Sequence, residues 1–343
     1  MKIRVIAIFL LIAASRLLSQ DSGYTGNVSN VGTTAAAFLN IGVGARATAM
    51  GGAFAAVSGD ASALYWNPAG ISLCRHPEIT FNHSDWYLDI YHEYIGAVAP
   101  AGRHAFGAGI TYVGVPDQVV RTIDQPEGTG DYYNAADLAL AVCYSYEFTD
   151  QFAMGFTFKY IHQRIYHSAA STAAVDLGAL YRPSALKWLT LGVQIANFGP
   201  DLRLRGSDLM QKIDIDESHN SSSELPASLD TDAFSLPLLF RFGVACKLLQ
   251  SKRNAFTLAA DLLHPSNNSE SLNLGAEYLF MGAFALRGGY HSLLERDYEI
   301  SGGLTLGAGL KVYTGGVLLL LDYAYQAHGV LENVNRISCG LVF

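Results

Sequence analysis

Long runs of alternating residues constrain the fold of this 343-residue chain more than any other feature. Residues 154–160, 272–278 and 284–290 each alternate large apolar side chains with small or polar ones, and similar runs recur from residue 77 onward. A period of two predicts strands with one apolar and one polar face. About fourteen such segments can be counted, and their length of about 10 to 14 residues suits tilted transmembrane strands better than the shorter strands of soluble proteins.

Two architectures use strands of this kind. A soluble sandwich turns its apolar faces to a core, whereas a membrane barrel turns them to lipid. Only 15% of the residues are charged, against about 25% in a typical soluble domain, which favours the barrel. A soluble periplasmic barrel or sandwich is the alternative, and extraction of the protein without detergent would support it.

The connections between the predicted strands alternate in length. Tight turns are expected at residues 100–103, 149–151, 183–186, 250–254, 280–283 and 313–316. Longer or more polar connections are expected at residues 84–90, 116–133, 166–171, 200–233, 264–269, 292–297 and 327–333. Short periplasmic turns and long outer loops are typical of outer-membrane barrels. The sequence therefore predicts an all-β fold, an antiparallel transmembrane β-barrel of about fourteen strands.

The connection at residues 200–233 is the longest and the most acidic. It carries eight acidic and three basic residues among serines and asparagines. We expect a solvated and mobile segment here, which serves as a docking surface or a lid, or is simply a disordered loop.

Charged residues within the predicted strands share one parity. They alternate with the bulky apolar residues, so they are expected to face the barrel lumen. These residues are Asp137, Lys159, Asp176, Arg241, Asp261, Glu277, Arg287, Asp322 and Arg336. Placing Asp322 or Glu277 on the lipid side instead would cost up to about a few kcal/mol each near the midplane. Five of the nine are acidic and four are basic. Mutual pairing is therefore expected rather than an ion-selectivity ring of one sign.

The first residues predict export to the bacterial outer membrane. Lys2 and Arg4 precede a short apolar run at residues 5–14, so residues 1–20 are expected to be a cleaved signal peptide. The run is shorter than the roughly 18 apolar residues that a transmembrane helix needs. Residues 21–31 are expected to form a flexible tail, and residues 77–343 the barrel.

Residues 32–76, between the tail and the barrel, differ from all that follows. They are rich in small residues, and their apolar positions keep neither alternation nor a long helical period. We expect short helical pieces that plug the barrel from within. The plug motif comprises Arg46, Asp60, Trp66, Asn67, Pro68 and Ala69. Pro68 cannot donate the backbone hydrogen bond that continues a helix, so Asn67-Pro68-Ala69 is expected to be the exit into the first strand.

No catalytic, cofactor or metal site is predicted. A net charge of −8, with 22 basic against 30 acidic residues, argues against nucleic-acid binding. The histidines form no metal-binding pair, and residues 42–47 lack the Lys-Ser/Thr of a phosphate loop. Cysteines with no CxxC spacing are expected as small apolar fillers at Cys74, Cys143, Cys246 and Cys339. We expect a non-enzymatic protein, although a Ser-His site assembled from distant residues would leave no readable pattern.

The plug region resembles a known family. The matching motifs are Phe38-Leu39, Gly44-Ala45-Arg46-Ala47, Met50-Gly51-Gly52-Ala53, Asp60-Ala61-Ser62-Ala63 and Trp66-Asn67-Pro68-Ala69-Gly70. They are similar to the N-terminal region of PorV/PorQ-type outer-membrane proteins, relatives of the FadL-like fatty-acid transporters, whose plug also carries Asn-Pro-Ala. The resemblance resumes at Asn197-Phe198-Gly199-Pro200, Leu321-Asp322-Tyr323-Ala324-Tyr325 and Asn335-Arg336-Ile337-Ser338.

The resemblance implies a FadL-like barrel blocked by its N-terminal segment, and two roles. PorV-type members act in type IX protein secretion, so the partners would be secreted cargo or other secretion-system proteins. FadL-like members pass hydrophobic molecules through the barrel wall, so the partner would be a hydrophobic ligand. Outer-membrane lipid surrounds the barrel in both cases. We expect first an accessory or cargo-shuttle component of secretion. Passive transport of hydrophobic molecules is the alternative. An apolar pocket lined by Phe38, Phe54 or Trp66 would favour transport.

Overall fold

Fourteen strands close into one antiparallel barrel in the computed structural model, which describes residues 30–57, 59–213, 225–251, 253–294, 303–329 and 333–343. The first seven are β1 (Glu78–Asp85), β2 (Tyr91–Ala101), β3 (His104–Val119), β4 (Tyr132–Thr149), β5 (Phe152–Ile165), β6 (Ser168–Tyr181) and β7 (Leu189–Phe198). The others are β13 (Leu239–Gln250), β14 (Ala255–Pro265), β15 (Ser271–Phe280), β16 (Phe284–Leu293), β17 (Leu304–Thr314), β18 (Val317–Gln326) and β19 (Val334–Val342). Pairing of β7 with β13 and of β1 with β19 completes the ring. The all-β barrel predicted from the alternation is confirmed.

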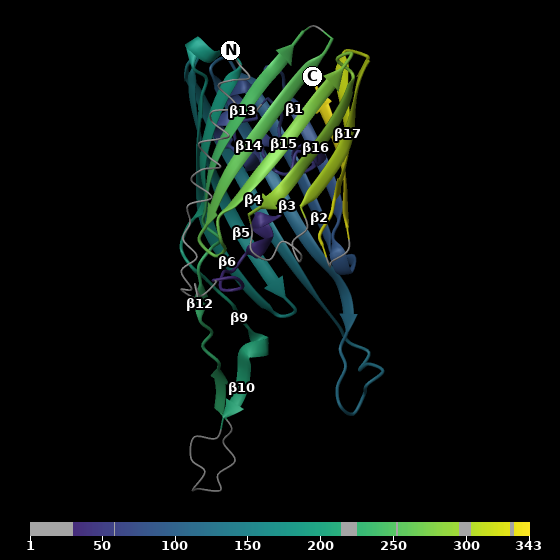
Figure 1. Cartoon of the computed structure of the whole chain (residues 1–343). Helices are drawn as coiled ribbons and strands as arrows, with labels where there is room; N and C mark the ends of the chain where they lie inside the picture. The colour runs from purple at the N-terminus through teal and green to yellow at the C-terminus, as the bar shows by residue number, and fades with distance from the viewer. Residues whose placement is uncertain (1–29, 58, 214–224, 252, 295–302, 330–332) are drawn as a thin grey trace, which may run out of the picture.

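The connections differ at the two ends of the barrel. Tight turns such as Gly315-Gly316 join strands at the end where β19 finishes, and the long β3–β4 and β7–β13 connections leave the opposite end (Figure 1). One predicted long connection, residues 166–171, is wrong. Only Tyr166 and His167 join β5 to β6, because the small residues after them are strand residues, and Ser168 is buried and pairs with β9.

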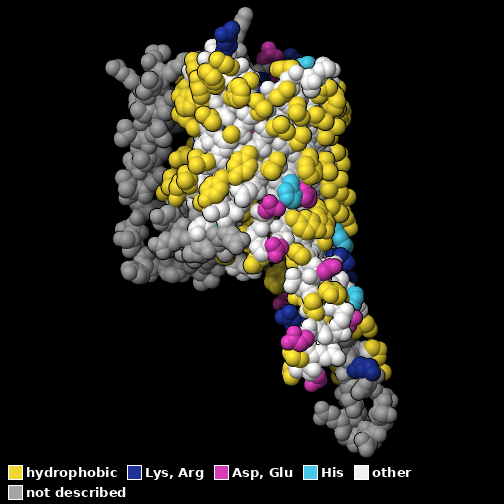
Figure 2. Space-filling model, turned by 90° about the vertical axis from the view of Figure 1, so that its right-hand side faces the viewer, with side chains coloured by type: hydrophobic (Ala, Val, Ile, Leu, Met, Phe, Trp, Pro, Cys, Tyr) yellow, Lys and Arg dark blue, Asp and Glu magenta, His cyan; other side chains and the backbone are white. Residues whose placement is uncertain are grey.

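Large apolar side chains cover the outer wall of the barrel. On β5 the exposed fractions of Met154, Phe156 and Phe158 are 44%, 43% and 47%, whereas Thr157 and Lys159, which have the opposite parity, are buried. Figure 2 shows hydrophobic side chains gathered over the wall and charged ones toward the ends and on the extension below. A continuous apolar surface of this size suits the hydrocarbon core of a membrane.

Four short helices of the N-terminal segment lie inside the barrel (Figure 1). They are η1 (Ala37–Asn40), α2 (Ala45–Ala49), α3 (Ala63–Trp66) and η2 (Pro68–Leu73). The backbone between α2 and α3 touches the wall where the strands carry glycine. A Cβ atom at Gly275 would lie 2.4 Å from the Met50 carbonyl oxygen, and one at Gly192 would lie 2.2 Å from that of Ala55. Glycine permits this close approach, and the two contacts lie on different strands of the wall, β15 and β7.

The expected signal peptide at residues 1–20 lies outside the described residues, as does the expected tail up to residue 29. The division at residues 32–76 and 77–343 stays a prediction, with β1 beginning at Glu78.

The connection from β7 to β13 forms an extension beyond the barrel (Figure 1). Its described residues build β8 (Leu202–Arg203), β9 (Arg205–Gly206), η5 (Ser207–Leu209), β10 (Met210–Ile213), β11 (Leu225–Ser228) and β12 (Ala233–Phe234). Strand β8 pairs with β12, β9 pairs with β6, and β10 pairs with β11 in a projecting hairpin. The interpretation as a disordered loop is therefore wrong for the described part of this connection. Leu202 and Leu236 are buried within an otherwise polar segment, and this burial stabilises an ordered structure.

Candidate functional site

A chain of ion pairs joins the N-terminal segment to the barrel wall. Arg46 of α2 donates through Nη1 to Asp60 Oδ2 at 2.7 Å, and through Nη2 and Nε to Glu277 of β15 at 2.7 and 2.8 Å. Glu277 also accepts from Arg287 Nε at 2.7 Å, and Arg287 Nη1 donates to Asp322 at 2.6 Å. The five side chains alternate in sign, so their mutual attraction offsets the cost of burying them.

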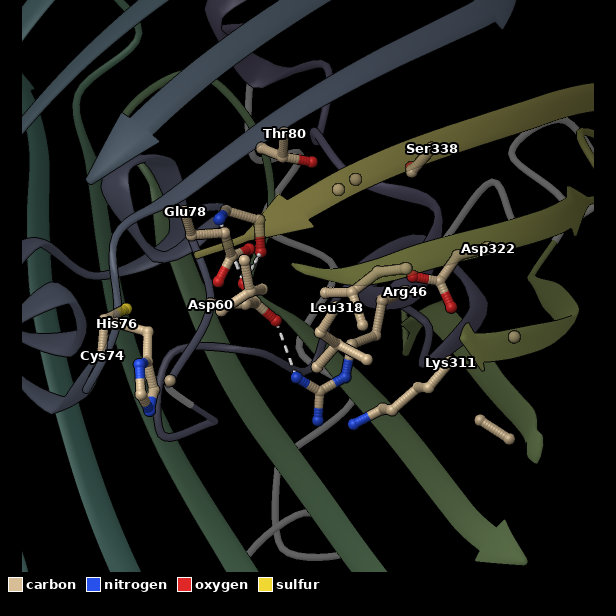
Figure 3. A pocket seen from close by; sticks show the side chains of 18 of the residues that line it. Arg46, Asp60, Cys74, His76, Glu78, Thr80, Lys311, Leu318, Asp322 and Ser338 are labelled. Atoms are coloured by element: carbon tan, nitrogen blue, oxygen red, sulfur yellow. Dashed lines mark hydrogen bonds and ion pairs between the residues drawn. The ribbon is translucent and has the colours of Figure 1, made fainter. Parts of the chain in front are cut away.

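A pocket of about 260 Å³ lies beside this ion-pair chain, at the short-turn end. Figure 3 shows Lys311 and Asp322 from the barrel strands near Arg46 and Asp60 of the N-terminal segment. Glu78 at the start of β1 also lines the pocket. The charged lining therefore includes side chains of both signs, several of which belong to the ion-pair chain.

The Asn67-Pro68-Ala69 motif joins two helices, with Asn67 between them and Pro68 and Ala69 in the first turn of η2. Asn67 Oδ1 accepts from the Ala69 amide at 3.1 Å, and its Nδ2 donates to the Ala179 carbonyl of β6 at 3.1 Å. Pro68 occupies the first position of η2, where its missing N–H leaves no bond unmade. The first strand begins only at Glu78. The predicted exit into that strand is therefore wrong, because this proline starts a helix in addition to following one.

The nine strand charges singled out in the sequence are all buried or half-buried: Asp137, Lys159, Asp176, Arg241, Asp261, Glu277, Arg287, Asp322 and Arg336. Asp261 Oδ2 accepts from the backbone amides of Phe54 and Ala55 at 2.8 Å each, so it holds the N-terminal segment against β14. Asp137 accepts from Gln163 at 2.9 Å.

Lys159 and Asp176 form a buried pair at the base of the extension. Their Nζ and Oδ1 atoms are 2.7 Å apart. Asn197, at the end of β7, donates its backbone amide to Asp176 at 2.8 Å, and its side chain accepts from Lys159 and donates to the Pro237 carbonyl at 2.9 Å. Asn197 has a φ of +64°, a conformation that asparagine tolerates better than most residues. The group fixes the direction in which the chain leaves β7.

A second pocket, of about 420 Å³, lies at the long-loop end of the barrel. Trp66, Arg241 and Arg336 line its inner part, and Trp86 and His328 line it from the connections. Of the three aromatic residues expected to mark a transport pocket, Trp66 lines this one, while Phe38 and Phe54 are buried within the packed segment.

The described residues of the two pockets do not form a metal centre. Among the residues that the structure describes, no group of three His, Cys, Asp or Glu side chains could hold a metal ion. All four cysteines are free; Cys74 and Cys143 are buried, and Cys246 and Cys339 are half-buried. No helix in the described ranges is long and apolar enough to cross a membrane.

Comparison with known proteins assigns the family. The sequence model of the family described as "Type IX secretion system protein PorV" matches residues 25–213, which is more than half of the chain. The chain belongs to the PorV family. Membership of this family, together with the barrel, identifies it as an outer-membrane protein. Among curated proteins, none matches.

Solved structures share the fold of this PorV-family chain at low sequence identity. The CymD monoaromatic hydrocarbon channel has a TM-score of 0.56 at 13% identity, over 88% of this chain and 97% of its own. The Pseudomonas putida toluene transporter TodX has a TM-score of 0.55 at 13% identity, over 88% of this chain and 97% of its own. A Pseudomonas aeruginosa FadL homologue has a TM-score of 0.52 at 13% identity, over 86% of this chain and 96% of its own. The likeness establishes a FadL-like barrel. Neither the family description nor these titles names an enzyme.

Two parts of the site have no signature in the sequence of this PorV-family protein. The close contacts at Gly192 and Gly275 cannot be predicted from the sequence, because the spacing of the glycines does not show which of them face the N-terminal segment. The second pocket is assembled from many separate stretches of chain. Periodicity places Arg241 and Arg336 on the inner face, but it does not distinguish them from Arg287, which has carboxylate partners.

Proposed function

We propose that this PorV-family protein is an accessory or cargo-shuttle component of type IX protein secretion. It would bind secreted cargo or other secretion-system proteins at the outer surface and would perform no catalysis. Family membership carries the proposal. The matched residues 25–213 include the N-terminal segment, strands β1–β7 and the extension through β10.

The attachment of the N-terminal segment supports a role other than conduction. Arg46 binds Glu277 of β15, Asn67 binds β6, and the amide of Phe54 binds Asp261 of β14. These bonds reach three strands of the wall, so moving the segment out of the lumen would break buried polar contacts, each of which is costly to leave unmade.

The β10–β11 hairpin supports a role in protein binding. It is a separate two-stranded sheet among the described residues, and strands with unpaired edges can accept an added strand from a partner. Its side chains Met210, Ile213 and Leu225 are 55%, 45% and 49% exposed. At its base, Asp208 accepts from the backbone amide of His167 at 3.0 Å, which ties the extension to the barrel.

Deletion of the hairpin tests the proposal. Residues 211–227 are replaced by two glycines in tagged protein, and the proteins that co-purify from native envelopes are identified. We expect loss of exported partner proteins, with an unchanged barrel melting temperature. The matched control replaces residues 121–130 of the β3–β4 connection at the same end and should keep the partners. Full retention of partners by the hairpin deletion would contradict the proposal.

Passive transport of hydrophobic molecules is the second candidate, favoured by the second pocket beside Trp66 and by the FadL-like fold. Uptake of toluene into vesicles that contain the purified protein measures it directly. The secretion proposal expects no uptake above that of protein-free vesicles. Saturable uptake that a Trp66→Ala variant alters would favour transport instead.

A further inference from the structure

Two short turns of the barrel are cationic although the protein as a whole is acidic. The chain carries a net charge of −8, and the long connections contribute to it, since residues 120–131 hold three acidic residues and one basic residue. The β6–β7 connection, in contrast, contains Arg182 and Lys187 and no acid. The β13–β14 connection contains Arg253 and no acid, and its position 252, which lies outside the described residues, is a lysine in the sequence. The two ends of the barrel therefore present opposite charge to their surroundings.

These two connections are neighbours on the rim of the barrel, because β7 pairs with β13. Where the two strands end, the Lys247 amide donates to the Trp188 carbonyl at 2.7 Å. Lys247 is also close enough to Arg182 for the two charges to repel each other. Four cations thus gather here, and we call them the cationic patch: Arg182, Lys187, Lys247 and Arg253. Trp188, which is half-buried, follows Lys187 in the chain and lies opposite Lys247.

Three cations of the patch are available to a partner. Lys187, Lys247 and Arg253 are exposed, and none of them forms an ion pair with another described residue. Glu277 attracts Lys247 from a longer distance, but it already binds two arginines of the ion-pair chain. Exposed charges of this kind keep their hydration until a partner of opposite sign replaces it.

The fourth cation shares its acid with another arginine. Arg182 Nη2 lies 2.5 Å from the buried Glu147, and Arg75 Nη1 lies 3.6 Å from the same carboxylate. Two guanidinium groups beside one carboxylate leave an excess positive charge. The adjoining β4–β5 turn adds one acid, Asp150, which is 3.5 Å from Arg103. The acids around the patch therefore do not neutralise it.

The inner part of the patch faces the mouth of the barrel rather than the surrounding lipid. Lys247 has the strand parity of Gly243, which packs against Ala55 of the N-terminal segment inside the lumen. Arg182 reaches Glu147, which is buried on the inner face of β4. A lipid headgroup approaches the barrel from outside its wall, so these two cations are directed away from it.

We infer that the cationic patch is a docking surface for an acidic peptide segment of a periplasmic protein. Short turns of outer-membrane barrels face the periplasm, and carboxylates form charge-assisted hydrogen bonds with lysine and arginine. The four cations come from two connections, so several carboxylates along a chain fit them better than one small anion does. Trp188 adds an aromatic side chain, and tryptophan and arginine are frequent at the centres of protein interfaces. The patch lies at the end opposite the β10–β11 hairpin, so it is independent of partner binding there.

Calorimetric titration with a defined peptide tests the inference. The purified protein, in nanodiscs of phosphatidylcholine, is titrated with a capped peptide of alternating glutamate and glycine residues and with its glutamine counterpart. We expect saturable binding of the glutamate peptide and no binding of the glutamine peptide. Affinity for the glutamate peptide should fall by at least about tenfold between about 50 and 500 mM salt, because salt screens exposed charges.

A combined variant locates the site. Lys187→Gln, Lys247→Gln and Arg253→Gln, introduced together, should weaken binding of the glutamate peptide by about 3- to 100-fold, since each exposed ion pair contributes a factor of about 1.4 to 5. The three side chains are exposed, so the melting temperature of the barrel should not change. Unchanged affinity in this variant would overturn the inference, as would equal binding of the glutamine peptide by the parent protein.

The matched control removes the same charge at the long-loop end. Arg121→Gln, Arg164→Gln and Arg205→Gln, introduced together, should leave peptide affinity as it is in the parent, and equal weakening by this control would contradict a localised site. Nanodiscs that contain phosphatidylglycerol distinguish a peptide site from a lipid site. The glutamate peptide should still bind in them; loss of its binding would assign the patch to anionic lipid headgroups and overturn the inference.

Discussion

Replacement of Glu277 by glutamine would break the ion-pair chain at its centre. Glu277 accepts from both Arg46 and Arg287, and a neutral amide leaves two guanidinium groups without that charge. Removing one partner of a buried pair costs about 3–5 kcal/mol. The Arg46 side chain is 26% exposed, so its hydration offsets part of this cost. We expect the free energy needed to release the N-terminal segment to fall by about 2–4 kcal/mol.

Hydrogen exchange measures this release without unfolding the barrel. Amides of α2 exchange when the segment opens locally, so a change of about 2–4 kcal/mol corresponds to exchange faster by about 30- to 900-fold. Amides of β3 and β4 serve as an internal control and should keep their protection, because the strand ladder does not depend on Glu277.

A double-mutant cycle refines the test. Arg46→Met should destabilise the segment strongly in the parent protein and much less in the Glu277→Gln background, since the shared interaction is already lost. Additive effects, or unchanged exchange of α2 in Glu277→Gln, would refute the reasoning and show that apolar packing alone holds the segment.

Three further perturbations probe the packing, the cap and the second pocket. Gly275→Ala should lower stability by about 1–3 kcal/mol because its methyl group would lie 2.4 Å from a backbone carbonyl; Gly288→Ala, whose nearest neighbour is at 3.7 Å, should leave the melting temperature unchanged. Asn67→Asp should lower the urea midpoint more than Asn67→Ala, because an unpaired carboxylate would replace a buried donor to two carbonyls; equal midpoints would contradict this. Burial lowers the pKa of His328 to about 4 from 6.5, so the unfolded chain binds this proton more readily and stability should fall as pH drops from 6.5 to 4; a His328→Gln variant should show a flatter pH profile of melting temperature.

The strands could be predicted because successive side chains of a strand face the membrane and the lumen in turn, and the two environments favour different residue types. On β5, Phe156 and Phe158 face outward and Thr157 inward, so alternation alone indicates the fold. Local sequence is less decisive at the Asn67-Pro68-Ala69 motif, because a proline is compatible with the position after one helix and with the start of another. Only the packing of both helices shows that Pro68 serves as a start.

The partners of the inner charges could not be predicted in the same way. Parity places Arg287 and Arg336 on one face, yet Arg287 meets Glu277 and Asp322 whereas Arg336 meets backbone and aromatic groups. Which partner each finds depends on strand register and on the path of the N-terminal segment. Neither can be read from the spacing of charges along the chain.

Photo-crosslinking from the hairpin tests the central claim most directly. A photoreactive amino acid replaces Ile213 of β10 in one variant and the outward-facing Phe156 of β5 in another, and both are irradiated in intact cells. The account predicts adducts with exported proteins from Ile213 and none of these from Phe156. Absence of protein adducts at Ile213, in cells that secrete normally, would contradict a role in holding secretion partners at the outer membrane.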